Sequence, residues 1–153
     1  MRALVQRVTH GKVKIDGAVK GEIENGFVIL LGVKHDDSEK DVDYLVEKIS
    51  GLRVFTDEAG KFNDSLLDRA YDLLIISQFT LYADTRKGKR PGFTESARPE
   101  TAIPLYEKFI SGFKGMGINV KTGEFGADMK VEIHNDGPVT IMLDSEDKIK
   151  RPS

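Results

Sequence analysis

Residues 73–93, LLIISQFTLYADTRKGKRPGF, begin as an apolar run, turn polar at Ser77 and Gln78, and end in a basic loop. A short apolar run rich in β-branched residues is typical of a buried strand, here 73–76. Polar residues where such a strand leaves the core suggest a chemical site on a rigid support, and the basic loop suggests an anionic ligand. A core strand followed by a solvated turn would explain the same residue types. The loop contains four cations in five residues: Arg86, Lys87, Lys89 and Arg90.

The length and composition of the chain indicate a single globular domain. Its 153 residues, 39% hydrophobic and 31% charged, suffice for one domain over 1–153 with its own core. No apolar run approaches the roughly 20 residues that cross a bilayer, and the first residues lack the apolar centre of a signal peptide. We therefore expect a cytoplasmic protein with no membrane partner.

Cysteine and charge content exclude several kinds of function. The chain has no cysteine, which excludes disulfides, a thiolate nucleophile and cysteine-bound metal. Its formal net charge of −2 argues against a general nucleic-acid coat, and we expect no DNA partner. A local basic patch remains compatible with this charge because the field at one site depends on the charges nearby.

The first third of the chain predicts an antiparallel meander. Asp16-Gly17 is a hairpin turn signal, and Asn25-Gly26 is another strong turn signal. The run that follows the second turn is apolar throughout, which is typical of a central strand. The predicted strands are 2–9, 12–15, 19–24 and 27–33.

Two amphipathic segments predict the main helices. The first begins after Ser38, a suitable N-cap with Asp41 three residues on, and ends near Gly51. The second lies within 96–116, and its regular part is expected to start at Pro104 because proline is awkward inside a helix. The apolar stripe of the first helix consists of Val42, Leu45, Val46 and Ile49. The expected buried face of the second consists of Ile103, Tyr106, Phe109, Ile110 and Phe113.

The remaining segments complete the predicted fold. Strands and helices in this order, without the spacing of regular β-α-β units, favour an α+β domain. Its sheet is expected to be mostly antiparallel and barrel-like, with two main helices. The other expected elements are a strand at 52–55, a helical turn within 64–70, closing strands at 118–122, 129–134 and 138–143, and a loose polar tail at 144–153.

Standard catalytic and cofactor motifs are missing from the sequence. His10, His35 and His134 do not have the spacing of helical metal ligands, and we expect no metal and no cofactor. The chain has no GxSxG nucleophile elbow, no GxGxxG and no GxxxxGK[ST], which argues against that class of hydrolase and against common nucleotide sites. His35 is interpreted as a loop residue and His134 as an exposed strand residue.

Three stretches remain candidates for chemistry. Residues 77–80 offer two hydroxyls without an evident base, and continued alternation would place Ser77 and Phe79 on one face. The turn NDGP at 135–138 contains a Gly-Pro bond that could be cis. The loop at 123–129 contains exposed apolar residues. Each stretch also has a purely structural interpretation. The hydroxyls in 77–80 could satisfy backbone groups, 135–138 could be a plain turn, and 123–129 could be a turn that anchors the core.

Together these stretches resemble the signature segments of one family. SQFTLYADTRKGKRPGF at 77–93, FGADM at 125–129 and NDGPVTIMLDS at 135–145 resemble the D-aminoacyl-tRNA deacylases, long called D-tyrosyl-tRNA deacylases. The resemblance covers nearly the whole chain, including the opening MRALVQRV. Separate long motifs at the family's spacing make it specific.

The resemblance implies an activity and a set of site residues. It implies hydrolysis of the ester that joins a D-amino acid to the terminal adenosine of tRNA, with L-aminoacyl esters rejected and glycyl esters as a further substrate. This activity is chiral proofreading in translation. The implied catalytic residues are Ser77, Gln78, Phe79 and Thr80. The implied substrate-binding residues are Phe125, Ala127, Met129, Gly137 and Pro138.

The resemblance also implies partners. It implies a homodimer of barrel-like α+β subunits in which Gly137-Pro138 forms a cis peptide that enters the partner subunit's pocket. The acceptor end of aminoacylated tRNA is the expected macromolecular ligand. Phosphate contacts position RNA without reading its sequence. The residues expected to make them are Arg86, Lys87, Lys89 and Arg90.

Two mechanisms and two other functions stay open at this stage. An aminoacyl ester is already activated, so backbone N–H groups near Phe79 and Thr80 could stabilise the oxyanion while the substrate's 2′-OH assists the attacking water. Alternatively, Thr80 could be a covalent nucleophile. The other functions are a small-molecule esterase that uses Ser77 or Thr80, and a non-catalytic RNA-binding module that stacks bases on Phe79 or Tyr82.

Overall fold

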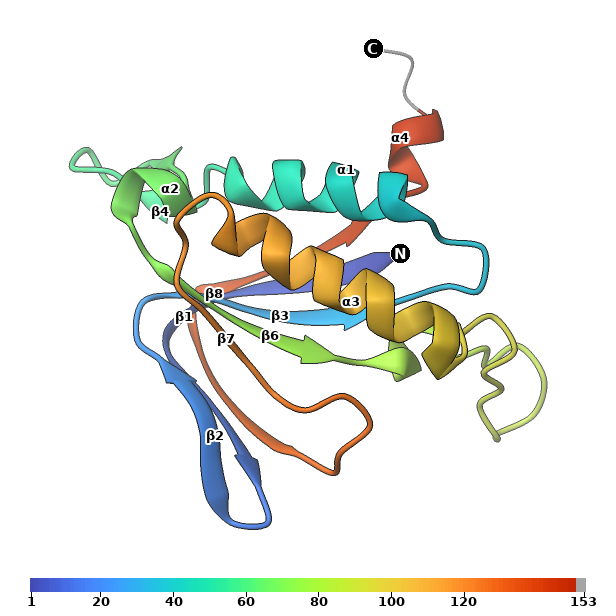
Figure 1. Ribbon diagram of the computed structural model, residues 1–153. Coiled ribbons are helices and arrows are strands. Elements are labelled where there is room, and N and C mark those ends of the chain that lie inside the picture. The colour runs from blue at the N-terminus through green and yellow to red at the C-terminus, as the bar shows by residue number, and fades with distance from the viewer. Residues whose placement is uncertain (151–153) are drawn as a thin grey trace.

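One curved sheet forms the centre of the protein, and two long helices pack across one of its faces (Figure 1). The computed structural model describes residues 1–150. The strands are β1 (Arg2–Ile15), β2 (Ala18–Ile23), β3 (Gly26–Gly32), β6 (Asp72–Ser77), β7 (Val120–Thr122) and β8 (Lys130–Asp144). Five of them lie in the order β2-β1-β3-β6-β7, and β8 pairs with β1.

The sheet is mixed, so the prediction of a mostly antiparallel sheet needs correction. β1 is antiparallel to β2, β3 and β8, but β6 runs parallel to both β3 and β7. Each parallel pair is joined by a crossover that contains a helix, as parallel neighbours require. The first crossover also contains a small hairpin of β4 (Phe55–Thr56) and β5 (Phe62–Asp64), and the second contains the basic loop. These insertions obscure the β-α-β spacing in the sequence.

The sheet curves until its edge strands approach each other, which makes the domain barrel-like as predicted. A Cβ atom on Gly21 in β2 would lie 3.2 Å from the Cβ of Lys121 in β7. One apolar cluster lies between the sheet and the helices, and a second fills the interior of the curve. Neighbouring residues of β6 alternate between them, because Ile75 belongs to the first cluster and Ile76 to the second.

The first main helix, α1 (Glu39–Ser50), forms as the sequence predicts. Ser38 is its N-cap, and the Asp41 carboxylate accepts a hydrogen bond of 2.8 Å from the Ser38 N–H. Gly51 is its C-cap. The predicted apolar stripe is buried at all four positions, Val42, Leu45, Val46 and Ile49.

The second main helix, α3 (Pro99–Lys114), begins at Pro99, so the expected start at Pro104 is wrong. Pro104 lies inside the helix with its ring exposed, so it is not part of the buried face. The buried face also differs slightly from the prediction. Its residues are Ala102, Leu105, Tyr106, Phe109 and Phe113, whereas Ile103 and Ile110 are only half-buried.

Two pairs of predicted strands are in fact single long strands. β1 spans both 2–9 and 12–15, and β8 spans nearly all of 129–134 and 138–143. The two strands pair along most of their length and absorb the interruptions as register shifts near Val8. Gly11 is a point of close approach and not a turn, because a Cβ atom there would lie 2.6 Å from a methyl carbon of Val28.

The short elements agree with the prediction in kind and differ in extent. A capped helical turn, α2 (Leu66–Arg69), lies within the predicted 64–70. β7 is shorter than the predicted 118–122. The strand expected at 52–55 overlaps only with the start of β4.

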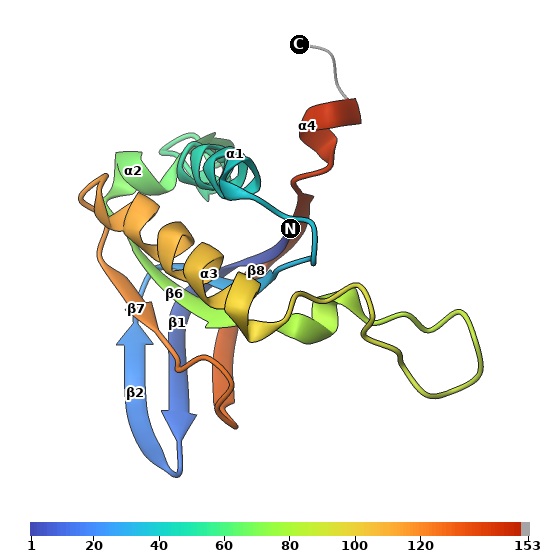
Figure 2. The ribbon, with the colours of Figure 1, turned by 45° about the vertical axis from the view of Figure 1, so that its right-hand side comes forward.

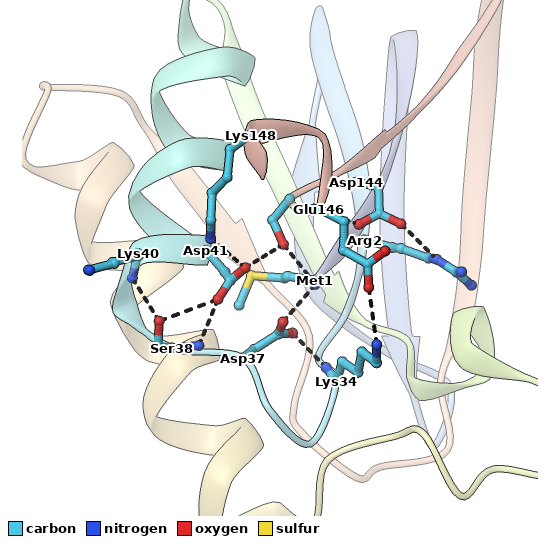
Figure 3. A network of polar contacts seen from close by, with 11 residues as sticks. Met1, Arg2, Lys34, Asp37, Ser38, Lys40, Asp41, Asp144, Glu146 and Lys148 are labelled. Carbon is cyan, nitrogen blue, oxygen red and sulfur yellow. Dashed lines mark hydrogen bonds and ion pairs between the residues drawn. The ribbon is translucent and has the colours of Figure 1, made fainter. Parts of the chain in front are cut away.

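The C-terminal segment is anchored, so the loose tail predicted for 144–153 is wrong as far as residue 150 (Figure 3). Ser145 is fully buried, and its hydroxyl accepts a hydrogen bond of 2.9 Å from the Met1 ammonium and donates one of 2.7 Å to Asp41. Lys148, in α4 (Asp147–Lys150), donates to the same carboxylate at 2.7 Å. The rest of the predicted tail, 151–153, lies outside the described residues.

The charge of Asp41 is stabilised by this network. Burial opposes its ionisation, but hydrogen bonds from Lys148, the Ser38 N–H and Ser145 outweigh burial and lower the pKa of Asp41 to about 2. The carboxylate therefore remains charged over the physiological range and joins the C-terminal segment to the start of α1.

Gly26→Ala is expected to destabilise the fold by more than about 3 kcal/mol. Gly26 starts β3 with φ +154°, and a Cβ atom there would overlap the backbone carbonyl oxygen of Asp72 in β6. Relief of that overlap would separate two central strands. Urea-induced unfolding measures the effect.

Gly51→Ala is the matched control, since Gly51 has φ −99° and a Cβ atom there would meet only the Glu47 carbonyl oxygen at 3.6 Å. We expect it to change the free energy of unfolding by less than about 1 kcal/mol. Equal effects of the two substitutions would show that the contact between β3 and β6 at Gly26 is not restrictive.

Candidate active site

A cleft of about 280 Å³ opens where β6 ends, beside the loop that precedes β8. It brings together two stretches that the sequence singled out, 77–79 and 125–129. A larger groove of about 340 Å³ between α1 and α3 contains none of the predicted site residues. The predicted residues that line the cleft are Ser77, Gln78, Phe79, Phe125, Ala127 and Met129.

The first wall of the cleft is shaped by an abrupt end of β6. The Gln78 N–H still donates to the carbonyl of Leu31 in β3 at 2.8 Å, and the chain then turns into a short 3₁₀ helix, η1 (Phe79–Tyr82). Gly32 makes this turn possible, because a Cβ atom there would lie 3.1 Å from the Gln78 carbonyl oxygen. The expected strand alternation through 77–80, with Gln78 and Thr80 on one face, is therefore wrong.

Two backbone donors are free at the start of η1. Within residues 1–150, no hydrogen bond engages the N–H groups of Phe79 and Thr80. The first N–H groups of any helix lack partners inside the helix. The carbonyl of Phe79, in contrast, is held by the Ser96 hydroxyl at 3.1 Å. The Phe79 ring is 55% exposed at the rim of the cleft and packs edge-on against Phe93.

The side chains of the first wall do not form a nucleophile–base pair. The Thr80 hydroxyl accepts a hydrogen bond from the Gln78 amide, and Thr80 does not line the cleft. Ser77 does line it, but no histidine is among the lining residues. The one carboxylate in the lining is that of Asp128, a residue that the sequence interpretation did not single out. This wall therefore offers backbone donors more readily than a charge-relay system.

The second wall of the cleft, residues 125–129, packs against the core. Phe125 packs against Tyr106 of α3 with ring centroids 6.0 Å apart. The Tyr106 hydroxyl donates to the carbonyl of Ile75 in β6 at 3.1 Å, and burial raises the pKa of Tyr106 to about 12. At Gly123 a Cβ atom would collide with the sulfur of Met129, so this glycine makes room for the Met129 side chain. The two walls are thus tied together through α3 and β6.

Gly137 and Pro138 do not line this cleft. They lie within β8, both are exposed, and the peptide bond between them is cis. The Asn135 side chain stabilises the turn by accepting the Val139 N–H at 3.0 Å. Within one chain, therefore, the Gly-Pro turn lies outside the cleft that contains the other predicted substrate-binding residues.

Arg7 supports the Gly-Pro turn, although the sequence interpretation missed it. Its guanidinium is buried, donates to the backbone oxygen of Asp136 at 3.1 Å and to that of Val54 at 2.8 Å, and pairs with the Asp136 carboxylate at 3.3 Å. A Cβ atom on Gly137 would lie 3.0 Å from this guanidinium. Arg7 occupies a buried position of an alternating strand, and an arginine at such a position is the signal that could have identified it.

The predicted basic loop projects away from the body of the protein (Figure 2). Arg86 is engaged within it, because its guanidinium makes two 2.9 Å hydrogen bonds with the carboxylate of Asp84. Those bonds lower the pKa of Asp84 to about 2. In the described part of the chain, Lys87, Lys89 and Arg90 are exposed and have no ion-pair partner.

Two broader features of residues 1–150 bear on the choice of function. No three acidic, histidine or cysteine side chains in this range are placed to share a metal ion. In the same range, no helix has the length and apolarity needed to cross a membrane.

Several known proteins are similar to this chain. A D-aminoacyl-tRNA deacylase of Thermosipho africanus is 56% identical over 146 residues, which are 95% of this chain and 98% of that protein. The protein of the same name from Fervidobacterium nodosum is 58% identical over equal shares. A solved structure described as a c-Myc DNA unwinding element binding protein superposes with a TM-score of 0.89 at 40% identity, covering 94% of this chain and 98% of that one.

The match to a family model is equally extensive. The model described as D-Tyr-tRNA(Tyr) deacylase matches residues 4–144, which include both walls of the cleft and the Gly-Pro turn. Because this match and those of the relatives extend over nearly the whole chain, the protein belongs to the D-Tyr-tRNA(Tyr) deacylase family.

Proposed function

We propose that this protein hydrolyses the ester bond of D-aminoacyl-tRNA and releases the free D-amino acid and tRNA. Family membership supports the reaction. The main support from the structure of this chain is the cleft, in which the free backbone donors at Phe79 lie next to the wall formed by 125–129. A small, open, largely uncharged cleft suits one aminoacyl group at the end of a long RNA.

The reaction needs little acid–base chemistry from the protein. An aminoacyl ester is activated, and the main requirement is stabilisation of the oxyanion as water attacks the carbonyl carbon. The N–H groups of Phe79 and Thr80 can donate to that oxygen, and one such donor typically contributes about 3–4 kcal/mol to transition-state stabilisation. The 2′-OH of the terminal ribose lies next to the ester and can position the water.

Discrimination between D- and L-substrates requires a rigid surface that faces the α-carbon, and a pocket for the side chain would not suffice. The two enantiomers carry the same groups, so only their arrangement around the α-carbon can be sensed. In our proposal, carbonyls of the Gly137-Pro138 turn accept the α-ammonium and the turn blocks an L side chain by steric clash. Glycyl esters, which lack a side chain, would then also be hydrolysed.

A second copy of this chain would supply that surface. Gly137 and Pro138 are exposed and lie outside their own cleft, so a partner subunit can present them where the chain's own fold does not. The two elements that would form the shared site, η1 and β8, each keep a large apolar side chain exposed. Phe79 of η1 is 55% exposed, and Met142 of β8 is 49% exposed. A homodimer would cover such surface. Sedimentation equilibrium should give the mass of two chains.

The basic loop is the proposed contact with tRNA. Lys87, Lys89 and Arg90 have free charges that can meet phosphates of the acceptor end, whereas Arg86 is already paired with Asp84. Affinity from such contacts falls as salt rises because binding releases counterions. The contacts would place the ester in the cleft without reading sequence.

The direct test is a comparison of three substrates. D-Tyr-tRNA should be hydrolysed, and both L-Tyr-tRNA and the simple ester p-nitrophenyl acetate should remain near the rate without protein. Release of radiolabelled tyrosine and the absorbance of nitrophenolate measure these rates. Rapid turnover of the simple ester would favour the small-molecule esterase, and binding of both tRNAs without hydrolysis would favour the RNA-binding module.

Thr80→Ala is expected to keep kcat within about threefold of the parent, because the backbone N–H remains and the hydroxyl is not a nucleophile in our mechanism. Single-turnover hydrolysis of D-Tyr-tRNA measures it. A loss of about 10⁶-fold, as expected on removal of a covalent nucleophile, would establish the alternative mechanism.

The matched experiment removes a backbone donor and keeps the hydroxyl. Phe79→Pro deletes one N–H at the first position of η1, where proline is compatible with a helix start. Relative to Phe79→Ala, which has the same loss of the ring but retains the N–H, kcat should fall about 10²- to 10³-fold. Equal rates for the two variants would exclude this N–H as the oxyanion donor.

Gly137→Ala is expected to lower the preference for D-Tyr-tRNA over L-Tyr-tRNA by about tenfold or more. Gly137 has φ +124°, and a Cβ atom there would crowd Val139 and Arg7, so the turn must move. Gly17→Ala is the control, since Gly17 also has a positive φ, +79°, but nothing within 4 Å. Unchanged hydrolysis of both tRNAs by Gly137→Ala would refute the proposed role of the turn.

A further inference from the structure

We infer that Arg2 is a positioning residue that holds η1, and with it the backbone donors of Phe79 and Thr80, in the geometry that the reaction requires. The inference rests on the proposed function and extends it to a residue outside the cleft. Arg2 lies on β1, two strands away from β6 in the sheet. It reaches the active site through η1 and not through the substrate.

Arg2 makes three different contacts with one guanidinium. One terminal nitrogen donates to the carbonyl of Leu81 in η1 at 2.8 Å. The guanidinium carbon lies 4.5 Å from the ring centroid of Tyr82, the buried last residue of η1. The Nε atom donates to the Asp144 carboxylate at 3.3 Å (Figure 3). The side chain therefore connects η1 with the end of β8.

The backbone of Arg2 is held firmly enough to serve as an anchor. Arg2 pairs with Gly32 of β3 on one side and with Asp144 of β8 on the other. The next residue of the C-terminal segment, Ser145, donates its N–H to the Met1 carbonyl at 2.8 Å. η1 packs against Gly32, and Arg2 is the residue of β1 that pairs with Gly32. Arg2 therefore lies on the strand next to the contact between Gly32 and η1.

η1 depends on such external contacts because it is only four residues long. A single 3₁₀ turn has poor hydrogen-bond geometry and does not persist by itself. Its internal and capping bonds are few, and the Leu81 N–H donates to the Gln78 carbonyl at a long 3.3 Å. Ser96 fixes the carbonyl at the first residue, and Arg2 fixes the last two residues. Removal of Arg2 would leave the end of η1 held only by packing and by the C-cap hydrogen bond from the Ala83 N–H to the Thr80 carbonyl.

The catalytic consequence follows from pre-organisation. Backbone donors stabilise an oxyanion well only when they already point at its position. Phe79 and Thr80 directly precede the carbonyl and ring that Arg2 holds, so a movement of Leu81 and Tyr82 would redirect both N–H groups. Displacement of a catalytic group by about 1 Å can cost roughly 10²-fold in rate. A lysine cannot reproduce the arrangement, because it lacks both the planar face and the second directed donor.

The experiment compares Arg2→Ala and Arg2→Lys with Arg53→Ala. Arg53 is a matched control: it also donates through its guanidinium to one neighbouring segment, at Asn63, and it precedes β4 in the first crossover, whereas η1 lies in the second. Steady-state hydrolysis of D-Tyr-tRNA gives kcat and KM. Amide hydrogen exchange of Leu81 and Ala83, whose N–H groups donate within η1 and its C-cap, reports the order of η1 without reference to activity.

Both Arg2 variants are expected to lower kcat roughly 10- to 100-fold with KM within about threefold, because tRNA contacts elsewhere are retained. Exchange at Leu81 and Ala83 should be about tenfold faster or more in both variants, and both readouts should be unchanged in Arg53→Ala. Parental kcat in Arg2→Ala, or parental exchange alongside a lower kcat, would overturn the inference. If Arg2→Ala does not fold, Arg2→Lys decides by the same criteria.

Failure of the proposed function would be recognised separately. In that case the parent protein itself would not hydrolyse D-Tyr-tRNA. The exchange measurement would still decide the structural half of the inference, since parental exchange in the Arg2 variants would overturn it whatever the substrate.

Discussion

The pairing of β1 with three other strands is the constraint on which the rest of the structure depends. One edge of this 14-residue strand pairs with β3 and then with β2, while β8 follows the other edge. The pairing brings the start of the chain beside the end of β8, and it places Arg2 beside Asp144 and Arg7 beside Asp136. Both arginines thus extend from the most constrained strand to the segments proposed to act on the substrate.

A site of this kind relies on backbone geometry more than on reactive side chains. The cleft contains hydroxyl, amide and one carboxylate group but no histidine, and its first wall presents free N–H groups. Backbone N–H groups do not titrate, so their contribution to catalysis depends on how closely they point at the oxyanion position before the substrate binds. This dependence explains why the contacts that hold η1 and the Gly-Pro turn matter as much as the residues in the cleft.

The sequence predicted those features that depend on local rules. The capping of α1 at Ser38, its buried stripe and the burial of 73–76 follow from periodicity and capping, which act within a few residues. Resemblance to a family selected Ser77 to Thr80, Phe125, Ala127 and Met129, and the structure places all of them except Thr80 in one cleft. The strand direction of β6 was not predictable in the same way, because it depends on the long crossovers that contain α1, α2 and α3. The break of β6 into η1 was missed because it requires a close approach to Gly32, a residue remote in the sequence.

Patterns in the sequence predicted the main buried segments, where α1 begins and ends, and which motifs relate the chain to its family. These properties depend on side-chain type and on neighbours along the chain. The three-dimensional arrangement was needed to show that residues 76–79 supply one wall of a cleft while Gly137 and Pro138 are exposed and lie outside it. Only the tertiary structure also assigned Arg2 and Arg7 to the support of these parts. The physical reason is that strand register and hydrogen bonds between remote segments set these distances, and no local pattern in the sequence encodes them.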